Sequence, residues 1–254
     1  MRHERIHTMT KVAILLPNSD LMEDAAYAAN LYHLDIVNMS VVNRHSIPEA
    51  VEKALREDVD VIMARGSHVD IIKSCSPAIP VVDIKITSLE VGVLISRAKS
   101  LVEKDCPVIA LTGPENMFAY INTGFLEEYY DIKLRFYTFV DPEQMRLTAK
   151  QAIEEGADVL IGGWAVGEIC EQEAFPFVKT ESGRESLLES CRTASYVGEA
   201  LALQKRYAKS LQTIIDYTYG GIIELDEDLR IQHVNRFSEN LLLSDSSQMK
   251  GRYI

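Results

Sequence analysis

The sequence lacks the close groupings of reactive side chains that disulfide frameworks and metal sites need. Its four cysteines, Cys75, Cys106, Cys170 and Cys191, stand far apart and form no C-x-x-C pair. No histidine lies at metal-ligand spacing from any of them. The sequence therefore predicts reduced, mostly buried thiols, with neither a disulfide framework nor a metal site.

Positive charge and long apolar runs are also scarce. The formal net charge is −12, so the chain offers no general surface for phosphates, and we expect no direct nucleic-acid contact from it. The early apolar run Val12–Leu16 is too short for a signal peptide, and no stretch reaches the length of a membrane span. These features predict a cytoplasmic protein without a membrane segment.

The signatures of common enzymes are missing as well. Dinucleotide binding needs G-x-G-x-x-G after the first strand, but that strand runs into Pro17-Asn18-Ser19. The run Gly162–Gly167 has the wrong spacing, and no lysine follows it as in a phosphate-binding loop. Arg65 stands near the place where a phosphoacceptor domain needs an aspartate, and the six histidines suggest no Ser–His–Asp arrangement. We therefore expect no catalytic residue and no cofactor.

Short apolar runs instead alternate with amphipathic stretches from Lys11 onward. Strands are predicted at 12–16, 36–42, 59–64, 79–84, 107–112, 133–140, 159–162 and 177–180. Helices are predicted at 20–31, 47–56, 69–75, 88–103, 115–129, 142–155 and 164–173. This alternation favours an α/β fold of two doubly wound, Rossmann-like parallel-sheet lobes, residues 11–88 and 89–182, with a ligand cleft between them.

A long helix is predicted at 183–218, with capping-box spacing between Ser182 and Glu185 at its start. Its apolar positions step alternately by four and three residues, as in a coiled coil. This seam consists of Val197, Leu201, Gln204, Ala208, Leu211 and Ile215. Pairing of the seam with a second copy in a homodimer, and packing of the helix along its own lobe, both remain open.

The tail at 219–254 has the pattern of a hairpin, 222–225 and 230–234, followed by a helix at 237–243. Such a segment cannot bury enough apolar surface to fold alone. We expect it to be the truncated beginning of a further domain, ordered by packing on the long helix or on a partner chain.

Polar and glycine turns follow the predicted strands, and ligands bind at strand ends in such sheets. Arg65-Gly66-Ser67 offers a forked cation, converging backbone N–H groups and a hydroxyl, which suit a carboxylate or phosphate. The start of the long helix also favours an anion. The candidate ligand-binding residues are Asn18, Ser19, Arg65, Gly66, Ser67, Thr112, Asn116, Gly163, Ser182, Gly183 and Ser186. Structural roles stay open: Arg65 could pair with Asp83 or Glu90, and Ser182 could be only a helix cap.

Three motifs resemble a known family. Arg65-Gly66-Ser67, Ile79 to Ile84 and Thr180 to Ser186 are similar to the N-terminal sensor domain of the propionate-catabolism activator PrpR, over about Lys11 to Gln212. The stretch from Gly221 to Asn235, with Leu241-Leu242 and Gly251-Arg252 beyond, resembles the start of a PAS domain.

The resemblance implies a sensor in a sigma-54-dependent transcriptional activator. An AAA+ ATPase and a helix-turn-helix domain beyond residue 254 would then contact sigma-54 RNA polymerase and DNA. PrpR-like proteins sense methylcitrate, but Trp164 and Ala174-Phe175 depart from the family's pattern, so methylcitrate and other small anions both stay open. The alternative is a stand-alone two-lobed binding protein or enzyme on the same architecture.

Overall fold

The computed structural model describes residues 9–76, 78–118, 121–139, 144–180 and 183–253, apart from the side chain of Trp164. The chain divides into two compact units, Met1–Gly198 and Glu199–Ile254. The first unit holds two α/β lobes, and the second holds the end of a long helix and a small hairpin.

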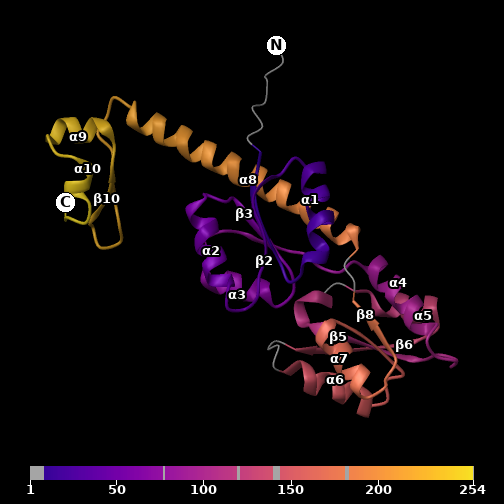
Figure 1. Ribbon diagram of the computed structural model, residues 1–254. Helices are drawn as coiled ribbons and strands as arrows, with labels where there is room; N and C mark the ends of the chain where they lie inside the picture. Colours follow the sequence, from indigo (N-terminus) through magenta and orange to yellow (C-terminus); the bar gives the residue numbers. More distant parts are fainter. Residues whose placement is uncertain (1–8, 77, 119–120, 140–143, 181–182, 254) are drawn as a thin grey trace. The chain divides into compact units, whose positions relative to one another are not determined.

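The first lobe is a four-stranded parallel sheet with helices on both faces (Figure 1). Its strands are β1 (Lys11–Leu16), β2 (Asp35–Val41), β3 (Val61–Ala64) and β4 (Val81–Asp83). Its helices are η1 (Ser19–Leu21), α1 (Met22–Leu31), α2 (Ile47–Arg56) and α3 (His68–Cys75). The two central strands, β1 and β3, are nearly continuous apolar runs because both faces of the sheet are covered.

The second lobe repeats this arrangement. Its strands are β5 (Val108–Pro114), β6 (Lys133–Phe139), β7 (Val159–Gly162) and β8 (Phe177–Lys179). Its helices are α4 (Ser88–Lys99), η2 (Glu115–Phe118), α5 (Thr123–Tyr130), α6 (Met145–Glu154) and α7 (Trp164–Gln172). Separate apolar clusters, around Ile161 and around Leu160, cover the two faces of the sheet.

Both lobes share one strand order, β2-β1-β3-β4 in the first and β6-β5-β7-β8 in the second. The chain leaves the first strand of each lobe toward one edge and returns toward the other. The carboxyl ends of β1 and β3, and of β5 and β7, are therefore the topological switch points at which such sheets bind ligands. The predicted fold class of two Rossmann-like lobes, a long helix and a small hairpin segment is confirmed.

Glu90 joins the beginnings of two helices. In the capping box of α4, Glu90 Oε2 accepts from the Thr87 N–H at 3.0 Å, and Thr87 Oγ1 accepts from the Glu90 N–H at 3.2 Å. The second carboxylate oxygen, Oε1, accepts from the Ser186 N–H at 3.1 Å. A side chain on Gly183 would meet Glu90 Oε1 at 2.5 Å, so this close approach requires glycine.

The long helix, α8 (Arg184–Asp216), changes character along its length. Its first half buries Leu187, Cys191 and Ala194, and Gly198 lies directly against Thr10. The helix therefore contacts the first lobe up to Gly198, through Asp83 and Thr10. Beyond that point the seam residue Leu211 is 60% exposed, whereas Leu201 and Ile215 are partly buried.

The second unit contains an antiparallel pair, β9 (Ile223–Leu225) and β10 (Ile231–Val234), then α9 (Arg236–Leu242) and α10 (Ser246–Met249). Asn235 is wholly buried and holds these pieces together. Its Oδ1 accepts from the Ile222 and Ser238 N–H groups, both at 3.0 Å. Its Nδ2 donates to the Ile215 and Gly220 carbonyls, at 3.0 and 2.9 Å.

Beyond shifts of one or two residues at many element ends, three differences from the sequence predictions stand out. The helix predicted at 115–129 is divided into η2 and α5, because Asn122 accepts from the Phe125 N–H and begins a new helix. The helix predicted at 88–103 ends at Lys99, where the chain turns. Helix α10 was not predicted, since four polar-rich residues carry no periodicity. Parts of the predicted elements at 133–140 and 142–155 lie outside the described residues.

Asn235→Ala is expected to loosen the second unit selectively. The variant loses both side-chain acceptor and donor contacts, each contributing on the order of 1 kcal/mol, so we expect local opening to become easier by about 2–3 kcal/mol. Amide hydrogen exchange at Ile231 and Val234 measures this. Asn240→Ala, at an exposed position on α9, is the matched control, and equal exchange in both variants would contradict the role of Asn235.

Candidate functional site

A cavity of about 810 Å³ opens at the carboxyl ends of strands from both lobes. Its lining includes Pro17 and Asn18 after β1, Arg65 to His68 after β3, and Thr112 to Pro114 at the end of β5. Phe139 ends β6, Gly163 follows β7, and Lys179 with Thr180 ends β8. The cavity therefore lies at the switch points of both sheets, where a two-lobed fold binds small molecules.

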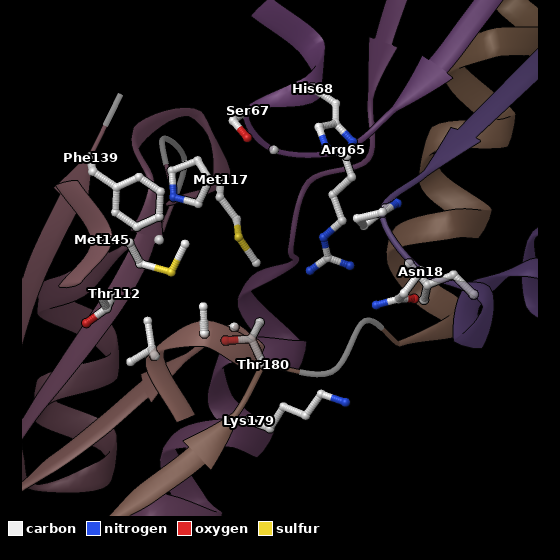
Figure 2. Close-up of a pocket in the computed structure, with 18 of the residues that line it drawn as sticks. Asn18, Arg65, Ser67, His68, Thr112, Met117, Phe139, Met145, Lys179 and Thr180 are labelled. Atoms are coloured by element: carbon white, nitrogen blue, oxygen red, sulfur yellow. The ribbon is translucent and has the colours of Figure 1, made fainter. Parts of the chain in front are cut away.

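Arg65 supplies the main charge of this cavity. It follows the buried strand β3 and is only 8% exposed, and its guanidinium points into the cavity in Figure 2. Its Nη1 is buried and has no hydrogen-bond partner among the described residues. Burial lowers the pKa of Arg65, while the charges of Glu90 and Asp83 raise it. A guanidinium stays protonated in proteins, so the cavity contains a buried cation with an unused donor.

Gly66 makes the turn that places Arg65. Its φ of +59° is the left-handed conformation that glycine adopts without strain, and the turn leads directly into α3. Asn116 of the second lobe donates from Nδ2 to the Gly66 carbonyl at 3.0 Å and to Asp83 Oδ2 at 3.2 Å. The turn is thus supported from the opposite lobe.

Three further lining residues present buried polar atoms without a partner in the described structure. They are His68 Nδ1, Thr112 Oγ1 and Thr180 Oγ1. Burial lowers the pKa of His68, so its imidazole is neutral at pH 7 and offers one donor and one acceptor. Buried polar groups in native proteins nearly always have partners, so these four groups are available to hydrogen-bond with water or with a polar molecule in the cavity.

Six of the eleven predicted site residues line the cavity: Asn18, Arg65, Gly66, Ser67, Thr112 and Gly163. Asn116 lies behind it, as described. Ser19 begins η1, and neither it nor Gly183 is among the described lining residues. Ser186 is 1% exposed, and its hydroxyl donates to the Gly183 carbonyl at 3.1 Å, so it serves the start of α8. Ser182 lies outside the described residues.

Several lining residues were not among the predicted site residues. They include His68, Met117, Phe139, Met145, Lys179 and Thr180. Phe139 and Lys179 lie within predicted strands, at 133–140 and 177–180, so a search for polar and glycine turns after strands passes over them. Met117 and Met145 follow strand ends at a greater distance and look like ordinary helix residues in the sequence. No rule used on the sequence distinguishes them.

Residues 35–204, more than half of the chain, match the family described as "Propionate catabolism activator", PrpR_N. The chain belongs to this family. The predicted resemblance is confirmed for the sensor part, and membership supports a role as the sensor domain of a regulator.

Solved structures resemble this PrpR_N-family chain to different degrees. A crystal structure of an NtrC-family transcriptional regulator from Clostridium acetobutylicum is 18% identical, with a TM-score of 0.58; the match covers 76% of this chain and 98% of that one. The transcription regulator CcpA of Lactococcus lactis is 15% identical, with a TM-score of 0.44 and coverages of 77% and 92%. No curated protein sequence matches the chain.

None of the helices in the described residues combines the length and apolar character needed to cross a bilayer. The described part of the chain likewise brings no three His, Cys, Asp or Glu side chains together as a metal site.

Asp83 lies next to the cavity, and its raised pKa predicts how the stability of the protein depends on pH. Burial raises its pKa from 3.8 to about 6, against the opposing charges of Lys85, Lys73 and Arg65. The folded state then holds the proton more tightly than the unfolded state, so the contribution of Asp83 to the stability of the wild type falls as the pH rises from 3.8 to about 6. Asp83→Asn removes this loss. We expect the melting temperature of the variant to exceed that of the wild type increasingly across this interval, and a constant difference would contradict the assignment.

Proposed function

We propose that this chain senses a small anionic metabolite and controls the downstream domains of a PrpR-like, sigma-54-dependent transcriptional activator. The observation that carries the proposal is the buried Arg65 guanidinium, whose Nη1 has no partner in the described structure. An anion placed there would supply the missing acceptor, and the neighbouring orphaned groups of His68, Thr112 and Thr180 would complete its hydrogen bonds.

The remaining parts of the proposal rest on the resemblance to PrpR-like regulators. The downstream domains would be an AAA+ ATPase and a helix-turn-helix domain, which would act on sigma-54 RNA polymerase and DNA in the cytoplasm. Residues 219–254 would begin a PAS domain. This chain would itself be neither an enzyme nor a DNA-binding surface, in keeping with its net charge of −12.

Binding at Arg65 can be tested by substitution. Arg65→Gln keeps hydrogen-bonding capacity but removes the charge, so we expect about ten- to a hundredfold weaker binding of an acid identified in a thermal-shift screen. Arg56→Gln is the control, because Arg56 is exposed on α2 and pairs with Glu52. Circular dichroism verifies folding, and isothermal titration calorimetry measures affinity. Unchanged affinity in Arg65→Gln would refute the proposed role of the cavity.

We also propose that α8 transmits the signal and pairs with its copy in a homodimer through the 197–215 seam. Leu211 belongs to the seam, whose positions step alternately by four and three residues, and it is 60% exposed in the single chain. Ile214, next to the seam residue Ile215, is 62% exposed. Two copies could bury this face against each other.

Leu211→Asp combined with Ile214→Asp tests the pairing. Both positions are exposed, so folding of the single chain should persist while two charges per copy face an apolar seam. Sedimentation velocity should show dimers for the wild type and monomers for the variant, with ligand binding retained. The control is Leu229→Asp, at an exposed turn position with φ of +61° that aspartate tolerates. A monomeric wild type at high concentration would disprove the dimer.

A further inference from the structure

The cavity has two chemically different sides. In Figure 2, Arg65, Asn18 and Lys179 lie on one side, and Phe139 with Met145 lies across from them, with Met117 between. Phe139 is 6% exposed and both methionines are partly buried, so this side is a lining of aromatic and thioether groups. A bound molecule would therefore meet cationic groups at one end and an apolar wall at the other.

The cationic side carries little net positive charge. Lys179 Nζ lies 3.9 Å from Asp20 Oδ2, and both residues line the cavity. His68 is kept neutral by burial, which lowers its pKa. The charge of Arg65 is already opposed by the carboxylates of Glu90 and Asp83. One additional negative charge can be accommodated by Arg65, whereas two or three would also be repelled by Asp20 and by those carboxylates.

The apolar side of the cavity also disfavours a ligand with more than one negative charge. A second carboxylate at Phe139 and Met145 would lose its hydration without meeting a cation among the described lining residues. Methionine side chains adapt to apolar shapes and contact aromatic rings favourably. The Thr112 hydroxyl is 1% exposed and has no partner in the described structure, so one polar substituent on the ligand's body has a place to bind.

We infer that the ligand is a monoanion with an apolar acyl or aromatic body, whose carboxylate binds Arg65 and whose body contacts Met117, Phe139 and Met145. The inference rests on the proposed function, since it specifies the ligand class of the same cavity. The volume of about 810 Å³ does not decide the matter, because small molecules of either class fit a space of that size. The charge of the cavity and the apolar character of its lining distinguish the two classes of ligand.

Calorimetry with four probes on the intact chain tests the inference. Hexanoate and phenylpropionate represent the expected class, tricarballylate carries three carboxylates, and phenylpropionamide lacks the charge. We expect one of the two monocarboxylates to bind at least about tenfold more tightly than tricarballylate and the amide, and to lose affinity in Arg65→Gln. Failure of both monocarboxylates to bind at millimolar concentration would overturn the inference.

Met145→Lys is an independent test, because it should reverse the preference of the cavity between the two classes of ligand. A cation at this position, the first residue of α6, would face Arg65 across the cavity. We expect the variant to lose affinity for phenylpropionate and gain affinity for tricarballylate. Leu147→Lys is the matched control, because Leu147 lies on the same helix, is 73% exposed and is not among the described lining residues.

The possible results separate the two proposals. If tricarballylate binds the wild type more tightly than the monocarboxylates and depends on Arg65, the anion sensor stands and the monoanion inference is overturned. If phenylpropionate binds equally well to wild type and Arg65→Gln, or if the amide equals the acid, both proposals are wrong. If Met145→Lys leaves both affinities unchanged, the placement of the apolar body is wrong.

Discussion

A buried guanidinium needs hydrogen-bond acceptors in place of water. In the first unit this constraint applies to Arg65 and to the residues around it. Arg65 is fixed by its position after a buried strand and by the left-handed turn at Gly66. Asp83 and Glu90 compensate part of its charge electrostatically. Its buried Nη1 has no partner among the described residues, and the guanidinium points into the cavity. The fold therefore keeps a buried cation where, under the proposed function, a bound anion would accept a hydrogen bond from it.

The two lobes contribute unequal chemistry to that cavity although they share one topology. The end of β3 provides Arg65, whereas the equivalent end of β7 provides Gly163, which has no side chain. Phe139 closes the edge strand β6 of the second lobe with an aromatic ring. Such asymmetry gives a bound molecule one preferred orientation. It also means that strand-end substitutions could alter specificity without disturbing either apolar core.

The sequence allowed the framework to be predicted well and the site only in part. Apolar strands such as Val12–Leu16 and Val159–Gly162 were recognisable because burial on both faces leaves nearly continuous apolar runs. Strand-end position identified Asn18, Arg65 and Thr112. Ser186, also among the candidates, supports the start of α8: its hydroxyl donates to the Gly183 carbonyl and its N–H donates to Glu90, 96 residues away. Met117 and Met145 reach the cavity only through tertiary packing, which no local pattern encodes.

Glu90 contacts the start of α8 and influences the charge of Arg65, so it could link ligand binding in the cavity to this helix. Its carboxylate holds the first turn of α8 through the Ser186 N–H, and the same carboxylate is a counter-ion of Arg65. Under the proposed function, an anion bound at Arg65 would share this cation with Glu90. The ligand would then not need to touch α8, because this sharing would link occupancy of the cavity to the residue that contacts the first turn of the helix.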